Sequence, residues 1–375
     1  MKIALNATCF SDRPSGAKQR FLGIYSELVR RLPDSEFIIY EPADCRVANW
    51  FGGAPNVAGR RTPVPSEGRT KKVISGFKFW GEALFRQEFD IYEQFNLPLV
   101  KIPSGQTLLT IHDIRGVHSG MNNLKRVLFK AVVERSLRAA GHVVTVSQSM
   151  KREILEFFPE TPISVIYNGF DAAAYSHISA ADILAVRTRL SLPAEFVLSV
   201  GHIESRKNYP RLVQAVALLR DRGVSIPLII IGNDSGERRA IERSIKAASL
   251  SGQVRILSGL TDLEVGCAYK LCSLFAFPSA YEGFGIPILE AMAAGRPMVL
   301  SDIPVFREIT QDRSVYFPYD DVGLMAEAIE TVLCSIHEQE RLVEYGKERV
   351  QAFSFKSLAE QMEGLYRSLA SPLNQ

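Results

Sequence analysis

The sequence has few cysteines and no long hydrophobic segment. Its 375 residues include five cysteines, which are scattered and never form a Cys-x-x-Cys pair. This spacing argues against a disulfide framework and a zinc site, and is typical of a reduced cytosolic protein. No apolar run reaches the roughly 18 residues that a membrane span requires. Met1 leads into the strand-like segment Lys2–Leu5 without a basic and apolar leader, so we expect a cytoplasmic protein whose membrane contact, if any, is peripheral at the inner face.

The chain also lacks a strong excess of charge of either sign. Lysine and arginine number 44, aspartate and glutamate 41, and the net charge is +3. A dedicated nucleic-acid-binding domain usually carries a strongly basic face, so we expect no nucleic-acid partner. With 46% hydrophobic residues, the chain is long enough for about two domains of roughly 100–200 residues each.

Short apolar segments alternate with amphipathic ones along the chain, in two series. The first series begins at Lys2–Asn6 and the second at Phe196–Val200, after a polar and alanine-rich stretch. Alternation of strands and helices indicates a parallel sheet covered on both faces. We therefore predict an α/β protein of two doubly wound, Rossmann-like domains, residues 1–190 and 191–354.

One region breaks this alternation. Residues 41–75 are rich in glycine, proline and arginine, as expected of a long exposed loop. Basic residues interleaved with aromatic ones extend over Arg60–Arg86. A solvated face with its aromatic rings turned into the core would explain this pattern. The alternative is contact with an anionic membrane or a lipid-phosphate acceptor.

The most informative stretch is Ser279–Gly295, which reads SAYEGFGIPILEAMAAG. It follows the apolar run Leu274–Phe277 and enters an alanine-rich segment with Pro287 near its start, a residue favoured in the first turn of a helix. The stretch therefore predicts a strand, a loop and a helix. The first amides of a helix lack intrahelical partners and bind anions well.

Glycines and carboxylates mark this loop as a ligand site. Gly283 and Gly285 let the backbone approach a ligand without an intervening Cβ. Glu282 lies in the loop, and we expect Glu290 in the first turn of the helix. Two carboxylates beside an anion site suit a neutral sugar attached to a phosphate.

A basic pair upstream supports an anion site. Arg206 and Lys207 lie at the expected start of a helix, where the helix dipole disfavours cations. Their position there suggests that they face a bound anion.

Taken together, these features resemble the donor site of glycosyltransferase family 4, retaining sugar transferases of the GT-B fold. The resemblance rests on Glu282–Ala293 and on Val200–Asn208, which reads VGHIESRKN, with support from Val144–Ser147 and Val165–Asp171. It implies two Rossmann-like domains facing across a cleft, with a terminal helix of about residues 355–375 packed back on the first. One departure is His202, where family members often have an arginine or a small residue.

The resemblance also assigns roles. Glu282 would hold hydroxyls of the transferred sugar and stabilise positive charge at its anomeric carbon, while Glu290 would bind the ribose. His112 would contact the sugar near the reacting carbon, and Asp113 is a weak candidate nucleophile. The implied catalytic residues are therefore Glu282, His112 and Asp113. The implied donor-binding residues are Gly16, Arg206, Lys207, Leu260, Gly283, Phe284, Gly285, Ile286 and Glu290.

The expected reaction moves a hexose from a nucleotide-diphosphate donor to a hydroxyl of a glycan or lipid-linked glycan. Tyr281–Pro287 looks most like mannosyltransferase members of O-antigen assembly, which favours GDP-mannose or a GDP-deoxyhexose. No cofactor or metal is expected, because no Asp-x-Asp loop suits a divalent ion. Alternatives are a UDP- or dTDP-sugar transferase, a nucleotide-sugar epimerase or another GT-B enzyme such as a phosphorylase. A nicotinamide dehydrogenase is disfavoured, because Asn6–Phe10 replaces the glycine-rich turn.

Overall fold

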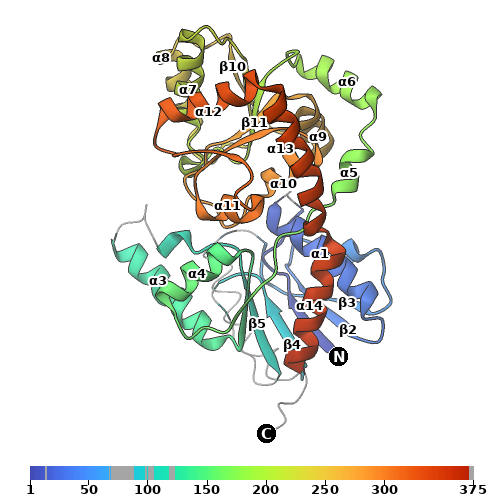
Figure 1. Ribbon diagram of the computed structural model, residues 1–375. Coiled ribbons are helices and arrows are strands. Elements are labelled where there is room, and N and C mark those ends of the chain that lie inside the picture. The colour runs from blue at the N-terminus through green and yellow to red at the C-terminus, as the bar shows by residue number, and fades with distance from the viewer. Residues whose placement is uncertain are drawn as a thin grey trace. The chain divides into compact units, whose positions relative to one another are not determined.

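The computed structural model describes residues 1–12, 15–66, 68, 88–97, 99, 105–117 and 123–370. The chain divides into two compact units, each built on its own sheet (Figure 1). Unit 1 comprises Met1–Gly169 and Phe355–Gln375, and unit 2 comprises Phe170–Ser354. Among the described residues, no helix has both the length and the apolar character needed to cross a bilayer.

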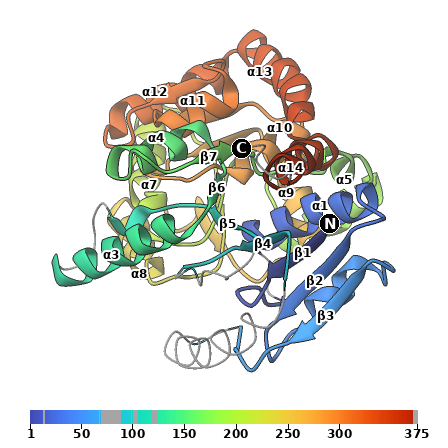
Figure 2. The ribbon, with the colours of Figure 1, turned by 90° about the horizontal axis from the view of Figure 1, so that it is seen from below.

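Unit 1 contains a seven-stranded parallel sheet of order β3-β2-β1-β4-β5-β6-β7 (Figure 2). Its strands are β1 (Lys2–Asn6), β2 (Glu36–Glu41), β3 (Val57–Arg61), β4 (Ile91–Gln94), β5 (Gln106–Ile111), β6 (His142–Thr145) and β7 (Ile163–Val165). The described helices are α1 (Gly16–Arg31), α3 (Asn123–Ala139), α4 (Gln148–Phe157) and α14 (Phe355–Ala370), with the 3-10 turns η1 (Val47–Phe51) and η3 (Arg115–Val117). The central strands β1, β4 and β5 are almost entirely buried, because helices cover both faces of such a sheet.

The last helix, α14, packs on the first helix of the chain, α1. Arg31 of α1 pairs with Glu360 and Glu363 of α14 at N–O distances of 3.1 and 2.8 Å. Tyr366 of α14 is fully buried and donates a hydrogen bond to the buried carboxylate of Glu93 on β4. The C-terminal helix is therefore part of the core of unit 1.

Unit 2 contains a six-stranded parallel sheet of order β10-β9-β8-β11-β12-β13. Its strands are β8 (Val197–Val200), β9 (Leu228–Ile231), β10 (Val254–Leu257), β11 (Leu274–Phe277), β12 (Met298–Ser301) and β13 (Val315–Phe317). Its helices are α5 (Ala172–Ser176), α6 (Ala180–Leu190), α7 (Tyr209–Asp221), α8 (Arg238–Ala247), α9 (Asp262–Leu271), α10 (Ile286–Ala293), α11 (Pro304–Thr310), α12 (Val322–Cys334) and α13 (Ile336–Arg349), with the 3-10 turns η4 (Ser205–Lys207) and η5 (Val350–Phe353).

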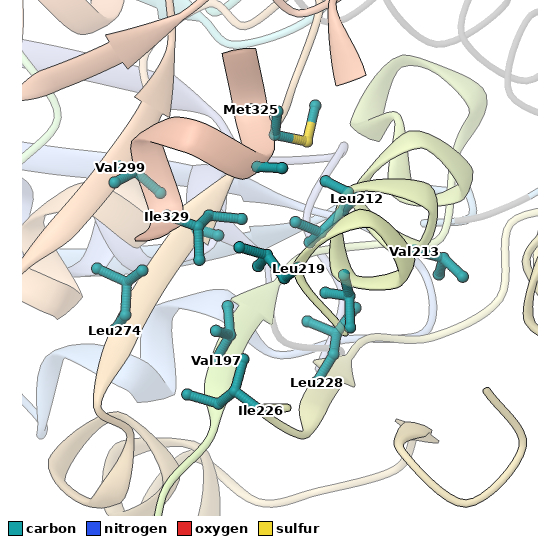
Figure 3. Close-up of a cluster of buried hydrophobic side chains, with 14 of the residues drawn as sticks. Val197, Leu212, Val213, Leu219, Ile226, Leu228, Leu274, Val299, Met325 and Ile329 are labelled. Carbon is teal, nitrogen blue, oxygen red and sulfur yellow. The ribbon is translucent and has the colours of Figure 1, made fainter. Parts of the chain in front are cut away.

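One core of unit 2 lies between its sheet and helices α7 and α12. Figure 3 shows side chains of Val197 and Leu274 from the strands meeting Leu219 of α7 and Ile329 of α12, all fully buried. This packing holds β8 and β11 in place, and ligands of open α/β sheets bind beyond the carboxyl ends of such strands. The predicted α/β class with two doubly wound sheets is confirmed.

The boundary between the units differs from the prediction. We expected it after residue 190, whereas the units divide between Gly169 and Phe170. The alanine-rich stretch between these positions forms α5 and α6, capped by Asp171 and Ser179, and these helices pack on α10 and α9 of unit 2. The composition of this stretch resembles that of a linker, although it is a pair of packed helices.

The predicted loop at residues 41–75 contains a strand, β3, and the turn η1. Strand β3 is an edge strand with four exposed residues, so it lacks the apolar alternation by which a strand is recognised. Arg60 and Arg61 of the predicted membrane stretch are exposed on it. The remaining basic and aromatic residues of that stretch, residues 69–86, lie outside the described residues.

Candidate functional site

The site in unit 2 is built on the segment between β11 and α10. Helix α10 begins at Ile286, with Gly285 as its N-cap and Pro287 in its first turn. Gly285 has a φ of +127°, and a Cβ there would lie 3.0 Å from the Phe306 ring. Glycine is therefore required both for its backbone conformation and for space. Because an N-cap glycine has no side chain to accept from the helix, the first amides of α10 are suited to an anion.

Glu282 of this loop pairs with two cations. Its side chain is 10% exposed, and its Oε1 lies 2.6 Å from Arg206 Nη1 and 2.7 Å from Lys207 Nζ. Burial alone would raise the pKa of Glu282, but Lys207 and Arg206 together lower it below its ordinary value. Glu282 is therefore an ionised, nearly buried carboxylate, and its Oε1 forms ion pairs with both Arg206 and Lys207.

The two cations come from the segment after β8. Gly201 directly follows this strand with a φ of +148°, and a Cβ there would lie 2.9 Å from Lys207 Nζ. Lys207 Nζ lies 4.6 Å from the centre of the Phe277 ring, at the end of β11. The amide of Ala280 donates to the carbonyl of Arg206 at 2.8 Å, which joins the two loops. The structure thus brings Arg206, Lys207 and Glu282 together at one point.

Glu204 is a member of this cluster that the sequence analysis missed. Its Oε2 pairs with Arg206 Nε at 2.9 Å, while Arg206 Nη1 also donates to the carbonyl of Tyr281 at 3.0 Å. Arg206 is thus held from two sides, and two carboxylates balance the two cations. The only signal in the sequence was an acidic residue two positions before the arginine.

Glu290 occupies a different environment from Glu282. It is the fifth residue of α10, so the expectation that it lies in the first turn is wrong. Its Oε2 accepts a hydrogen bond from the fully buried Tyr269 of α9 at 2.9 Å. Burial raises the pKa of Glu290 to about 7, although the hydrogen bond from Tyr269 opposes this rise. The sequence contained no signal for Tyr269.

Of the other predicted residues of unit 2, Phe284 is buried with its ring 5.9 Å from that of Phe353. Leu260 follows a loop at the end of β10. The amide of Gly259 donates to Asn233 Oδ1 at 3.1 Å, and Ser258 Oγ donates to the carbonyl of Gly232 at 2.6 Å. These bonds fix the loop against the end of β9. Leu260 itself is partly exposed.

In unit 1, the predicted residues follow β1 and β5. Gly16 is the first residue of α1, where the hydroxyl of Ser15 accepts from the amide of Lys18 at 3.2 Å. His112 lies directly after β5 and is partly exposed. Although part of His112 is exposed, desolvation of its ring and the nearby Arg20 guanidinium lower the pKa of His112 to about 3, so its imidazole is neutral at physiological pH.

Asp113, the candidate nucleophile, is engaged locally. Its Oδ1 accepts from the amide of Arg115 at 3.3 Å and lies 3.7 Å from Arg115 Nε. Its side chain is 38% exposed. Within the described parts of the chain, His, Cys, Asp and Glu side chains form no group of three or more that could hold a metal ion.

Two family models match most of the chain. The model described as "Glycosyltransferase Family 4" matches residues 16–174, and the one described as "Glycosyl transferases group 1" matches residues 185–349. The chain belongs to glycosyltransferase family 4. This membership agrees with the resemblance drawn from the motifs of the sequence.

The curated relatives of this family 4 chain include mannosyltransferases. It is 28% identical over 238 residues to the O-antigen chain mannosyltransferase RfbU of Salmonella typhimurium, a match covering 63% of this chain and 62% of that protein. It is 26% identical over 331 residues to the phosphatidyl-myo-inositol mannosyltransferase of Mycobacterium leprae, covering 84% and 83%. The match thus spans less than two thirds of the Salmonella relative.

Solved structures share the fold of this family 4 chain. Sucrose-phosphate synthase from Thermosynechococcus elongatus superposes with a TM-score of 0.77 at 20% identity, covering 98% of both chains. WaaG, a glycosyltransferase involved in lipopolysaccharide biosynthesis, has a TM-score of 0.76 at 16% identity, covering 97% of this chain and 99% of WaaG. Anabaena HepE in complex with UDP and glucose has a TM-score of 0.76 at 19% identity, covering 98% and 100%.

Proposed function

We propose that the chain is a retaining, metal-independent glycosyltransferase that moves a hexose from a nucleotide-diphosphate donor to a hydroxyl of a glycan or lipid-linked glycan. One observation carries this proposal: Arg206 and Lys207 converge on one oxygen of Glu282 beside the glycine-rich start of α10. Two cations and a helix start suit a diphosphate, and an ionised carboxylate suits the sugar attached to it.

The same groups supply transition-state stabilisation. As the bond between sugar and diphosphate breaks, negative charge grows on the leaving oxygen and positive charge on the anomeric carbon. The negative charge would be stabilised by Arg206, Lys207 and the first amides of α10, and the positive charge by Glu282. These groups are positioned before the substrate binds, so little reorganisation accompanies the reaction.

We propose that the transferred sugar keeps its anomeric configuration without a covalent intermediate between sugar and protein. The acceptor hydroxyl attacks from the face that the diphosphate leaves, and the leaving phosphate takes its proton. A double displacement would need a carboxylate on the opposite face of the sugar. Asp113, the candidate for that role, is turned to Arg115. His112, neutral by its lowered pKa, is proposed to contact the transferred sugar.

We propose GDP-mannose or a GDP-deoxyhexose as the donor. The names of the relatives, O-antigen and phosphatidyl-myo-inositol mannosyltransferases, support a mannose-type sugar and a lipid-linked or polysaccharide acceptor. A UDP-sugar is the main alternative, since HepE, which shares the fold, was solved with UDP and glucose.

A panel of nucleotide sugars, screened by protection against thermal unfolding, tests the proposal. A donor at 100 times its Kd should raise the free energy of unfolding by about 2.7 kcal/mol. Glu290→Ala should abolish this protection, whereas Glu282→Ala should retain most of it and lose turnover. Leu184→Ala, at an exposed position of α6, serves as the control variant.

Three outcomes would contradict this reading. If no nucleotide sugar protected the protein against thermal unfolding, the proposed donor site would be excluded. Equal protection of the Glu290→Ala variant would remove the role of that residue. If incubation with the nucleotide sugar alone, without an acceptor, inverted a stereocentre of the sugar, the protein would be an epimerase.

A further inference from the structure

Two adjoining hollows lie along the seam between helices α7 and α8 of unit 2, which pack against each other (Figure 1). The first has a volume of about 550 Å³ and is lined by the starts of α7, α8 and α12. The second has a volume of about 490 Å³ and is lined by α7 and α8. Pro210 and Gln214 of α7 line both hollows. The two hollows therefore form one groove, which we call the α7–α8 groove.

The first hollow is lined by polar side chains whose hydrogen-bonding groups are unused. Arg211, Glu237 and Asp320 all line it, yet none of them forms an ion pair with another described residue. Arg211 Nη1 is enclosed and has no hydrogen-bond partner among the described residues. The side chains of Ser205 and Gln214 likewise form no hydrogen bond within the described chain. Because these groups do not pair with one another, their hydrogen-bonding capacity is available to a ligand.

The charges of the first hollow determine what kind of ligand fits. An anion would be repelled by Glu237 and Asp320, and a simple cation by Arg211. A hydroxyl group both donates and accepts hydrogen bonds, so a ligand with many hydroxyls satisfies the carboxylates and the guanidinium together. Ligand pockets of about 300–1,000 Å³ are usually lined mostly by hydrophobic side chains, whereas polar ones predominate here. The first hollow therefore suits an uncharged ligand that is rich in hydroxyls.

The second hollow adds small apolar side chains. Ala240, Ala247 and Ala248 line it together with Arg243, which is exposed and forms no ion pair with another described residue. A sugar ring has apolar C–H patches as well as hydroxyls, so alanines beside an arginine provide for both. A single amino acid or monosaccharide would occupy one hollow only. The continuation of the groove therefore favours a chain of sugars.

One end of the groove lies at the turn that carries the proposed donor cations. Glu204 and Asn208 line the first hollow, and the η4 turn between them contains Arg206 and Lys207. Neither of these cations lines the groove, and neither does Glu282. The groove is thus next to the donor site but is built from other side chains.

We propose that the α7–α8 groove binds a chain of neutral sugars at a site separate from the donor site. In the first hollow, Glu237 and Asp320 accept hydrogen bonds from hydroxyls, and Arg211 and Gln214 donate them. In the second hollow, a sugar ring lies on the alanines. Such a chain has two possible sources, the glycan that takes part in the transfer or an unrelated oligosaccharide. Only the first source rests on the proposed function.

Saturation-transfer difference NMR of the full chain with added sugars tests the groove. The probes are α-linked mannotetraose, maltotetraose and mannose. Mannotetraose should bind at least about fivefold more tightly than mannose, because only the longer probe makes hydrogen bonds in both hollows. Tighter binding of mannotetraose than of maltotetraose would indicate a mannose-type glycan as the source, and equal binding would indicate neutral glycans in general. Neither GDP nor UDP should displace the tetrasaccharide.

A double substitution tests the first hollow. Gln214→Ala/Glu237→Ala removes a donor and an acceptor and should raise the Kd for mannotetraose about tenfold, because both hydrogen bonds are lost. The control, Glu340→Ala/Gln351→Ala, makes the same changes at exposed positions of α13 and η5 that do not line the groove, and should bind like the parent chain. Thermal unfolding followed by circular dichroism verifies that each variant is folded.

A single substitution tests the second hollow. Arg243→Ala should raise the Kd for mannotetraose about threefold or more, because Arg243 lines this hollow and would donate to hydroxyls. Arg239→Ala removes an equal charge from an exposed position of the same helix that does not line the groove, and should leave the Kd unchanged.

Four results would overturn the proposal. These are no saturation transfer to either tetrasaccharide, a tetrasaccharide that binds no more tightly than mannose, equal losses in the groove and control variants, or displacement of the tetrasaccharide by GDP or UDP. The thermal-protection screen with nucleotide sugars concerns the donor site, so the proposed function and the groove can fail independently.

Discussion

At the scale of single residues, the environment of Glu282 depends on how Arg206 is held. Glu204 fixes Arg206 Nε at 2.9 Å, which leaves Arg206 Nη1 directed to Glu282. Without Glu204, Arg206 could turn about its long side chain, so the diphosphate would meet a less ordered cation. We therefore regard Glu204 as a positioning residue for the proposed transfer.

Glu204→Ala should lower kcat/KM for the donor about tenfold, equivalent to about 1.4 kcal/mol, because it removes a hydrogen bond to a charged group. The loss should lie mainly in kcat, because removing a negative charge also favours binding of an anionic donor. Glu204→Gln, which keeps the length and an acceptor oxygen, should recover part of the rate. Glu330→Ala, which breaks a surface pair with Arg222 at 3.1 Å, is the control. Full activity of Glu204→Ala would refute the role.

Glu290 should make donor binding depend on pH near neutrality. Its pKa is raised to about 7, chiefly by burial, and the ionised carboxylate accepts hydrogen bonds from ribose hydroxyls much more strongly than the protonated acid does. Since the ionised fraction falls roughly tenfold from pH 8 to pH 6, KM for the donor should rise by about the same factor. Between its unfolded and folded pKa values the native state binds more protons, so this residue makes the free energy of unfolding fall as pH rises.

Measurements of KM against pH for two variants separate Glu290 from other groups. Tyr269→Phe removes the hydrogen bond that lowers the pKa of Glu290, so the inflection should move to higher pH. Glu290→Gln should raise KM for the donor and make it nearly independent of pH between pH 6 and pH 8. An unchanged inflection in both variants would assign the pH dependence to another group.

At the scale of elements, most strands and helices could be predicted because they are buried on both sides. The apolar runs at β9, β11 and β13 are uninterrupted, and the run Leu274–Phe277 that was recognised in the sequence is strand β11. Strand β3 escaped prediction because it lies at an edge with exposed residues, and α5 and α6 because their alanine-rich composition resembles a linker. The residue pattern of a segment reveals a strand or a helix only where one of its faces is buried, and β3, α5 and α6 are little buried.

The candidate site was predictable for a related reason. The cluster of Glu282, Arg206 and Lys207 depends on loops that end neighbouring parallel strands, β8 and β11, and these loops must meet at one edge of the sheet. The pairing of Tyr269 with Glu290 joins two helices. No periodicity predicts which residue of one helix reaches another, so Tyr269 required the structure.

At the scale of the whole molecule, unit 1 is completed only by the last helix of the chain. Helix α14 contributes the fully buried Leu358, Met362 and Tyr366 to its core. Residues separated by all of unit 2 therefore belong to one folding unit. The two tryptophans, Trp50 and Trp80, both lie within Met1–Gly169, so tryptophan fluorescence reports on unit 1, whereas circular dichroism reports on both units.

Met362→Ala should therefore destabilise unit 1, although the substitution lies near the C-terminus. Emptying a fully buried methionine site costs about 2–5 kcal/mol, which should move the urea midpoint of fluorescence lower by about 1–2 M. Met325→Ala, an equally buried position in the core of unit 2, should instead shift the circular dichroism transition and leave the fluorescence midpoint in place. A fluorescence midpoint unaffected by Met362→Ala would mean that the core of unit 1 is stable without the packing of α14.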